Sequence, residues 1–172
     1  MIPVFQTIVD KGYGDCMRAA VASLLELSLE EIPDFKNEES KEPRDWKKST
    51  VIGYLHSIGL DACCINKRDD LNQGTDFLIK VAKFDGGYKG CFYASVPSQT
   101  FPNIFHAVVV DTDLNIVHDP NPNQRALSLK PEDVESIMVT KSMVIGKTRK
   151  LFTREGWENA SEEERDANTH KH

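Results

Sequence analysis

The sequence has few of the features that would place a protein in a membrane or on nucleic acid. It contains no apolar run long enough to span a bilayer, and its start lacks the basic residues and apolar stretch of a signal peptide. The formal net charge of -6 leaves no basic surface for many phosphate groups. We therefore expect a cytoplasmic protein without a cofactor. Its expected partner is a polypeptide or small amide substrate, and not nucleic acid or a membrane.

The cysteines also lack the spacing of a zinc site or a redox dithiol. Four of them stand at positions 16, 63, 64 and 91, with no C-x-x-C pair, and neighbouring cysteines make a poor disulfide. Free thiols in a reducing compartment are expected, with the last three acting as small buried hydrophobes. No metal site is expected, because Cys16, His106 and His118 have no recognisable ligand spacing.

Apolar residues at helical spacing predict two helices in the first third of the chain. Residues 16–27 place five apolar side chains on one face, and residues 45–58 repeat the pattern before Gly59. The polar stretch between them, residues 36–43, is expected to be a loop. Asp15 immediately precedes the first helix and is expected to cap it.

After Gly59 the pattern changes to short apolar runs, which are typical of strands. These runs are residues 60–65, 77–82, 90–96, 105–110 and 114–118. A helix start is expected at residues 130–133 and a last strand through residues 144–145. Helices followed by strands indicate one α+β domain with an antiparallel sheet, covering residues 1–147. Residues 148–172 are highly charged, and we expect them to form a mobile or marginally helical tail.

Cys16 occupies the position in the sequence that is best suited to a nucleophile. A thiol attacks as its thiolate, and the positive end of a helix lowers the pKa of a thiol on the first turn. Gly12, Tyr13 and Gly14 form a flexible approach to that turn. The alternative is a cysteine that only packs at a helix start.

Residues 105–120 have the pattern of a β-hairpin that brings a histidine to an aspartate. If Thr112 and Asp113 form the turn, His106 lies directly opposite Asp119. Opposed side chains have Cβ atoms about 4.5 to 5.5 Å apart, within reach of a carboxylate–imidazole hydrogen bond. A four-residue loop keeps this pairing, whereas a three-residue loop with a bulge would bring His118 or Pro120 opposite His106.

A thiolate, a base and a group that orients the base are the parts needed for nucleophilic cysteine catalysis. Cys16, His106 and Asp119 occur in contexts suited to these three parts. His118 alternates to the face opposite Asp119 and is therefore expected to be structural or exposed.

Short segments of the chain resemble the papain-like cysteine peptidases, and within them the double-glycine leader peptidase-like proteins. The matching features are Gln6, Gly14-Asp15-Cys16 before an alanine-rich helix, His106 at a strand, and His118-Asp119-Pro120 after the next strand. In the leader peptidase-like group a glycine usually follows the cysteine, whereas this chain has Met17.

The resemblance implies a papain-like fold, in which a helix carrying the cysteine packs on an antiparallel sheet carrying the histidine and aspartate. It also implies an oxyanion hole formed by the side chain of Gln6 and the backbone N–H of Cys16. The function expected is a cysteine hydrolase, a peptidase or isopeptidase that forms a thioester with its substrate. Deamidation and acyl transfer use the same intermediate and stay open, as does a non-catalytic binding module on this scaffold.

Overall fold

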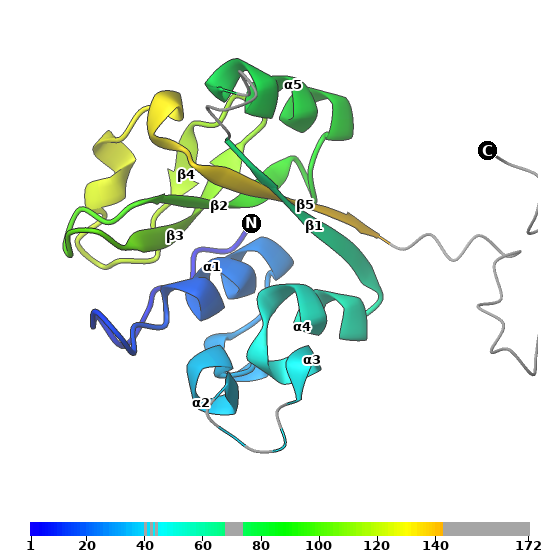
Figure 1. Cartoon of the computed structure of the whole chain (residues 1–172), viewed down its shortest axis with the longest axis vertical. Helices are drawn as coiled ribbons and strands as arrows, with labels where there is room; N and C mark the ends of the chain where they lie inside the picture. The colour runs from blue at the N-terminus through cyan, green and yellow to red at the C-terminus, as the bar shows by residue number, and fades with distance from the viewer. Residues whose placement is uncertain (40, 42, 44, 68–73, 143–172) are drawn as a thin grey trace, which may run out of the picture. The chain divides into compact units, whose positions relative to one another are not determined.

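A computed structural model describes residues 1–39, 41, 43, 45–67 and 74–142 of the chain (Figure 1). These residues lie in one compact unit, Met1–Ser142, and residues 143–172 fall outside the described part. The predicted tail at residues 148–172 and the last predicted strand, residues 144–145, fall outside the described residues as well. No described helix has the length and apolar character needed to cross a membrane.

The described unit has the α+β architecture expected from the sequence. Its antiparallel sheet has the strand order β1-β5-β2-β3-β4. The strands are β1 (Leu60–Asn66), β2 (Cys91–Pro97), β3 (Phe105–Asp111), β4 (Ile116–His118) and β5 (Ser136–Ser142). The helices are α1 (Cys16–Leu25), α2 (Phe35–Glu39), α3 (Trp46–Ser49), α4 (Val51–Ser57) and α5 (Thr75–Asp85). Short 3-10 turns are η1 (Leu29–Glu31), η3 (Arg125–Ser128) and η4 (Pro131–Asp133).

The strand predicted at residues 77–82 is wrong, because this segment lies within helix α5. A short apolar run suits either a buried strand or a buried helix, and the burial pattern decides between them. Leu78 and Ala82 stand four residues apart and are both completely buried, which is the spacing of one helix face. Gly86 ends the helix with a φ of 78°, a conformation that glycine adopts without strain.

The single helix predicted for residues 45–58 is divided into α3 and α4 at Thr50. Thr50 has an extended backbone with a φ of -136°, and its hydroxyl accepts a hydrogen bond of 3.0 Å from the Gly53 N–H. The division also brings the two helices close together, since a Cβ on Gly53 would lie 2.2 Å from the Trp46 carbonyl oxygen. A threonine N-cap therefore begins a new helix where the apolar spacing continues unbroken.

Two shorter segments also differ from expectation. Helix α2 occupies part of the predicted loop at residues 36–43, and the buried side chain of Phe35 anchors it to the core. The helix expected to start at residues 130–133 is only the 3-10 turn η4, and β5 begins soon after it. Proline starts a helical turn well, but too few residues follow before the strand to extend it.

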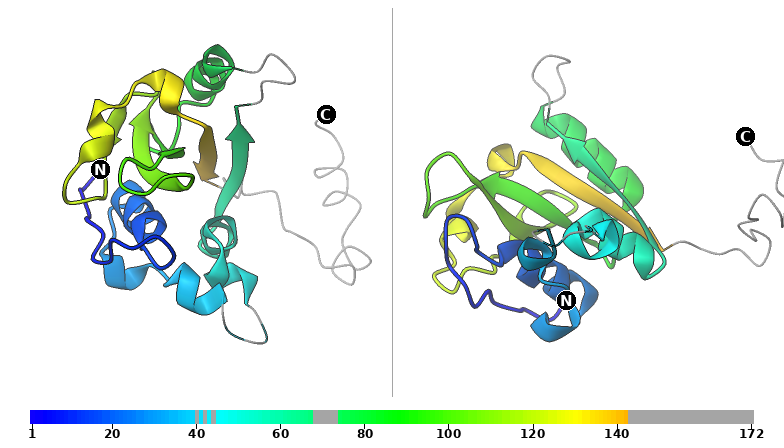
Figure 2. Two further views of the ribbon diagram at one scale, coloured as in Figure 1. Left: turned by 60° about the vertical axis from the view of Figure 1, so that its left-hand side comes forward. Right: turned by 60° about the horizontal axis from the view of Figure 1, so that its bottom comes forward.

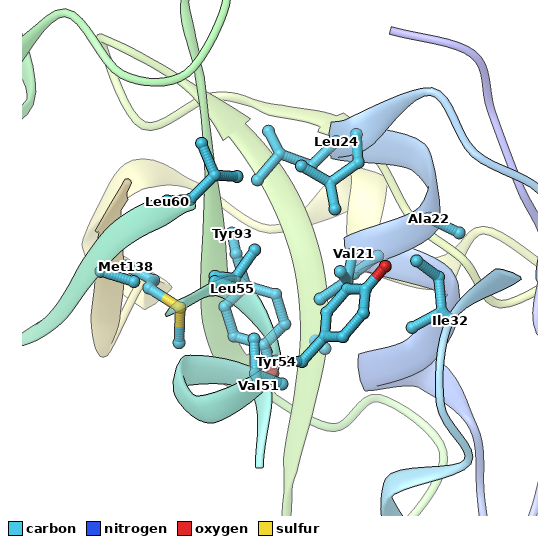
Figure 3. Packing of buried hydrophobic residues seen from close by; sticks show 14 of the residues in the cluster. Val21, Ala22, Leu24, Ile32, Val51, Tyr54, Leu55, Leu60, Tyr93 and Met138 are labelled. Atoms are coloured by element: carbon cyan, nitrogen blue, oxygen red, sulfur yellow. The ribbon is translucent and has the colours of Figure 1, made fainter. Parts of the chain in front are cut away.

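The sheet has a hydrophobic cluster on each face, and strand β3 contributes to both. Ala107 and Val109 pack with α1, α2 and α4, whereas Val108 and Val110 pack with α5. Figure 2 shows α1 and α5 on opposite sides of the sheet. Figure 3 shows the α1 side, where Val21 and Leu24 of α1 belong to the same cluster as Tyr54, Leu55, Tyr93 and Met138. The helix that begins at Cys16 is thereby fixed against the strand that carries His106.

The N-terminal segment is tied to both α1 and the end of β4. The Val4 N–H donates to Ser23 Oγ at 2.8 Å, and His118 Nε2 lies 2.9 Å from the Val4 carbonyl oxygen. Phe5 also meets the His118 ring edge-on, with centroids 5.4 Å apart. His118 is buried and structural, one of the two roles expected for it.

Asp15 stands at the N-cap position of α1, but its side chain does not cap the helix. Its carboxylate instead accepts hydrogen bonds from the Thr7 N–H, the Thr7 hydroxyl and the Ile8 N–H, at 2.9 to 3.2 Å. The expected helix cap is therefore wrong. The Asp15 carboxylate therefore holds the N-terminal segment at Thr7 and Ile8 instead of the first turn of α1.

Candidate active site

Cys16 is the first residue of α1, and its side chain faces the start of β3. The His106 side chain and the backbone N–H groups of Ala107 and Met17 lie within hydrogen-bonding reach of the thiol. Burial is the largest influence on this thiol and opposes its ionisation. These hydrogen bonds and the charge on His106 outweigh burial and hold the Cys16 pKa below its ordinary value.

His106 lies between Cys16 and Asp119. Its Nε2 is 2.7 Å from Asp119 Oδ1, so the other ring nitrogen, Nδ1, is the one available to the Cys16 sulfur. Burial disfavours the imidazolium, but the hydrogen bonds and negative charges of Asp119 and Cys16 raise the His106 pKa to about 9. The opposite pKa shifts of Cys16 and His106 favour a thiolate–imidazolium pair at neutral pH.

Asp119 is 1% exposed, and its carboxylate takes part in three hydrogen bonds. Besides His106, the Asn121 N–H donates to Oδ1 and the Ala126 N–H donates to Oδ2, each at 2.8 Å. Burial alone would raise the pKa of this carboxyl, but the three hydrogen bonds and the charge of His106 lower it. Asp119 is therefore ionised and rigidly placed.

The hairpin register predicted from the sequence is wrong, although the contact between His106 and Asp119 is present. Val110 pairs with Ile116 and Val109 pairs with His118, with a bulge between the two pairs. Leu114 adopts a φ of 63° and donates to the Asp111 carbonyl, which produces the three-residue loop considered as the alternative.

The side chain of Asp119 reaches His106 for a different reason from direct cross-strand pairing. Asp119 lies one residue beyond β4, where the chain leaves the sheet. Its bonds to the backbone of Asn121 and Ala126 close a turn around the carboxylate. This turn, and not the strand register, aims the carboxylate at the imidazole.

Gln6 lies beside these residues, with its backbone N–H bonded to the Pro120 carbonyl at 2.9 Å. The Gln6 side chain is buried, and its Nε2 donates to the Ile8 carbonyl at 2.9 Å. One N–H of this amide is therefore used by the protein itself, and the second is left for another acceptor. Oε1 is buried without a hydrogen-bond partner among the described residues.

A cleft of about 250 Å³ opens over Cys16 and His106. One part of its wall comes from the loop before α1 and from Lys36, and another from the β2–β3 connection. The lining residues are Gln6, Val9, Asp10, Lys11, Gly12, Gly14, Cys16, Met17, Lys36, Ser98, Thr100, Phe101, Ile104, Phe105, His106 and Asn121. The nucleophile and base thus face a space in which a substrate can bind.

No family model, curated protein or solved structure matches this chain. The function of the protein must therefore be inferred from the site itself. Among the described residues, no cluster of three or more histidine, cysteine, aspartate or glutamate side chains is arranged to hold a metal ion.

The other cysteines have environments different from that of Cys16. Cys63 and Cys64 are exposed on β1, an edge strand of the sheet, so the expectation that they are buried is wrong. Cys91 is half-buried, and burial raises its pKa. Strand periodicity allows either face of an edge strand to be exposed, and the sequence alone does not show which strand is at the edge.

Sequence reasoning missed three contributors to the site: the backbone N–H groups of Ala107 and Ala126, and the side chain of Asn121. The two backbone groups carry no sequence signal, because any residue except proline supplies an N–H. Asn121 had a local signal, since asparagine between two prolines is typical of a turn that hydrogen-bonds to its own backbone.

Proposed function

We propose that this protein is a cysteine hydrolase with a papain-like fold, which cleaves a peptide or isopeptide bond through a thioester. The observation that supports the proposal most strongly is the position of His106, which interacts with the Cys16 thiol and is hydrogen-bonded to the buried Asp119 at 2.7 Å. Each member has the pKa shift that its role requires. A nucleophilic thiol needs a low pKa, its acid partner a high one, and the orienting carboxylate a low one.

In the first half of the reaction, the Cys16 thiolate attacks the substrate carbonyl and the His106 imidazolium gives its proton to the leaving amine. The carbon–nitrogen bond breaks, leaving a thioester and a neutral imidazole. In the second half, the imidazole takes a proton from water as the oxygen attacks the thioester. The carbon–sulfur bond then breaks, and the thiolate and imidazolium are restored.

The oxyanion formed in each half needs hydrogen-bond donors close to Cys16. The Cys16 backbone N–H is on the first turn of α1, where backbone donors have no partner within the helix. The second N–H of Gln6 Nε2 is the side-chain donor in this proposal. Its bond to the Ile8 carbonyl fixes the orientation of the amide before substrate arrives.

The compartment expected from the sequence is part of the same proposal. All four cysteines are free thiols, and a cytoplasmic location keeps a nucleophilic thiol reduced. Deamidation and acyl transfer would use the same acyl-enzyme with a different leaving group or acceptor. A binding module on this scaffold would have no use for a depressed thiol pKa.

The acyl-enzyme can be sought without knowledge of the natural substrate. We would mix the protein with p-nitrophenyl acetate at pH 7 and follow both p-nitrophenolate release and the mass of the intact chain. We expect one acetyl group to appear on Cys16 and then to be lost by hydrolysis over repeated turnovers. Cys16→Ala should abolish this turnover, and Cys63→Ser, which removes an exposed thiol, should retain it.

Acetylation of Cys16 without later hydrolysis would favour the binding module. Acetylation confined to Cys63, Cys64 or Cys91 would contradict the assignment of the nucleophile. Peptide mapping of the acetylated chain separates these outcomes, because the four cysteines are distributed over three well-spaced segments of the sequence.

A further inference from the structure

Asn121 is a buried polar side chain in the wall of the cleft whose amide nitrogen has no partner. The residue is 6% exposed and lines the same cleft as Cys16 and His106. Its Oδ1 accepts the Asn123 N–H at 2.9 Å. No described residue accepts a hydrogen bond from Nδ2, and this atom is not among the buried polar atoms that lack partners. Nδ2 is therefore a donor that solvent or a ligand can reach.

The orientation of this amide is determined by the chain. Because a backbone N–H requires an acceptor, the bond from Asn123 fixes Oδ1 toward the turn and Nδ2 away from it. The backbone of Asn121 is fixed as well, since its N–H donates to Asp119 Oδ1. The same turn that holds Asp119 against His106 thus holds the Asn121 donor in the cleft wall. Such a rigid donor needs little reorganisation to bind an acceptor.

The position of Asn121 relative to the His106 imidazole indicates which part of the substrate Asn121 contacts. Cys16 lies at one end of the His106 ring, and Asp119 with Asn121 lies at the other. In the proposed reaction His106 gives its proton to the leaving amine, so the leaving group extends from Cys16 across the imidazole. Asn121 therefore lies on the leaving-group side of the cleft, and the helix N-terminus lies on the acyl side.

We infer that Asn121 Nδ2 donates a hydrogen bond to the carbonyl oxygen of the residue that follows the scissile bond. This inference rests on the proposed hydrolase function and narrows its substrate class. The leaving group must carry a carbonyl close to its amine, as the α-amine of a polypeptide does. A lysine side-chain amine has no such carbonyl, and ammonia from a deamidated glutamine has none either. The site is therefore built for α-peptide bonds.

The inference can be tested by letting an added amine, instead of water, attack the acyl-enzyme from the leaving-group side of the cleft. An acetyl thioester formed at Cys16 from p-nitrophenyl acetate can be attacked by water or by an added amine. In the second case the amine nitrogen attacks the thioester carbonyl and His106 takes a proton from it. The carbon–sulfur bond then breaks, giving an N-acetylated amine and the Cys16 thiolate. The ratio of amide to acetate measures how well the leaving-group side binds the amine.

Two amines distinguish the predicted hydrogen bond from general access to the cleft. Glycinamide has a carbonyl next to its amine-bearing carbon, and allylamine has none. For each amine, the amide-to-acetate ratio of a variant is compared with the ratio of wild-type protein, so the difference in basicity between the two amines cancels. The variants are Asn121→Ala, which removes the amide, and Asn121→Asp, which keeps the acceptor for Asn123 but loses the donor. Asn123→Ala is the matched control, because its backbone N–H remains.

We expect both Asn121 variants to lower the amide-to-acetate ratio with glycinamide about three- to tenfold, the loss expected for one neutral hydrogen bond. The ratio with allylamine should stay within about twofold, and Asn123→Ala should match wild type with both amines. Equal losses with the two amines, or no loss with glycinamide, would overturn the role of Asn121 while the acetyl-enzyme still supports the hydrolase. Absence of any acetyl-enzyme at Cys16 would overturn both proposals together.

Discussion

His106 Nε2 lies 2.7 Å from Asp119 Oδ1, an oxygen that also accepts the Asn121 N–H. The carboxylate is therefore shared between the imidazole and the turn that follows β4. This sharing makes Asp119 both an orienting group for the base and a structural centre for the turn. Substitutions at Asp119 should consequently affect stability and reactivity at once.

Replacing Asp119 by alanine tests this double role. Asp119→Ala leaves the buried N–H groups of Asn121 and Ala126 without partners, which should cost about 2 to 4 kcal/mol of unfolding free energy. Urea unfolding measures this loss. On folded protein, turnover of p-nitrophenyl acetate should fall strongly but less than in Cys16→Ala, since the nucleophile and base remain.

Asp119→Asn should retain more turnover than Asp119→Ala, because the amide oxygen can still accept the His106 N–H. Its amide nitrogen, however, would face the Ala126 N–H, so its stability should stay below that of wild type. Wild-type turnover by folded Asp119→Ala, with strong loss on changing Asp111 or Asp113, would place the orienting carboxylate elsewhere.

The two histidines near the site should respond differently to substitution. His118 holds the N-terminal segment through the Val4 carbonyl and contacts neither Cys16 nor Asp119 through a hydrogen bond. His118→Gln should therefore lower the melting temperature, at a cost of about 1 kcal/mol, and leave the iodoacetamide reactivity of Cys16 largely intact. His106→Gln should do the reverse, with a large loss of reactivity. A similar loss of reactivity in both variants would mean that the N-terminal segment controls the thiol.

Asp15 provides a test of how the approach to α1 is held. Asp15→Ala removes the acceptor for the Thr7 N–H, the Thr7 hydroxyl and the Ile8 N–H, so the expected cost is about 1 to 3 kcal/mol. Hydrogen exchange should then speed up at Thr7 and Ile8 and much less within α1. Faster exchange through the first turn of α1 would show that Asp15 acts as the helix cap after all.

Truncation tests the boundary predicted from composition. A chain that ends at Lys150 should keep its melting temperature and the iodoacetamide reactivity of Cys16, because every group of the proposed site lies within Met1–Ser142. Thermal melting and labelling of the truncated chain measure both. A large loss of stability would show that Leu151, Phe152 or Trp157 packs on the folded unit.

The sequence was sufficient to predict those parts of the fold that depend on local periodicity and chemistry. Helix α1 and strands β1, β2 and β3 follow directly from apolar spacing and were predicted within a few residues. Helix α5 was missed because a short apolar run suits a buried strand as well as a buried helix, and only the burial pattern in the structure distinguishes the two. The break at Thr50 was missed because capping depends on a hydrogen bond and not on hydrophobicity.

The site shows a similar division between local chemistry and tertiary placement. Cys16, His106 and Asp119 were selected by residue type and context, and the structure brings them together. The geometry that joins them was not predicted, since the bulge in β4 and the turn after it depend on long-range packing. Backbone donors such as the Ala126 N–H are invisible in a sequence, because they depend on where the chain passes.

The pH dependence of hydrolysis follows from the directions of the pKa shifts. The Cys16 pKa is lowered, so turnover should decline on the acid side only below the ordinary pKa of a thiol, as the thiolate takes up a proton. The His106 pKa is raised to about 9, so turnover should decline again as the pH rises through that value and the imidazolium is lost. A pH profile for cleavage of an amide substrate, corrected for the Cys16→Ala background, gives both limbs, because the leaving amine needs the His106 proton. With p-nitrophenyl acetate only the acid limb is expected, because p-nitrophenolate leaves without a proton.

The rate of iodoacetamide labelling at Cys16 as a function of pH tests the central claim, a thiolate paired with the His106 imidazolium, most directly. In wild-type protein we predict a thiolate that is already reactive below the ordinary thiol pKa, with a further change near pH 9. In His106→Ala the acid limb should move to higher pH, because burial still opposes ionisation while the attraction of the imidazolium is gone. A single transition at the pH of an ordinary thiol, unchanged by His106→Ala, would contradict the ion pair and the catalytic role assigned to it.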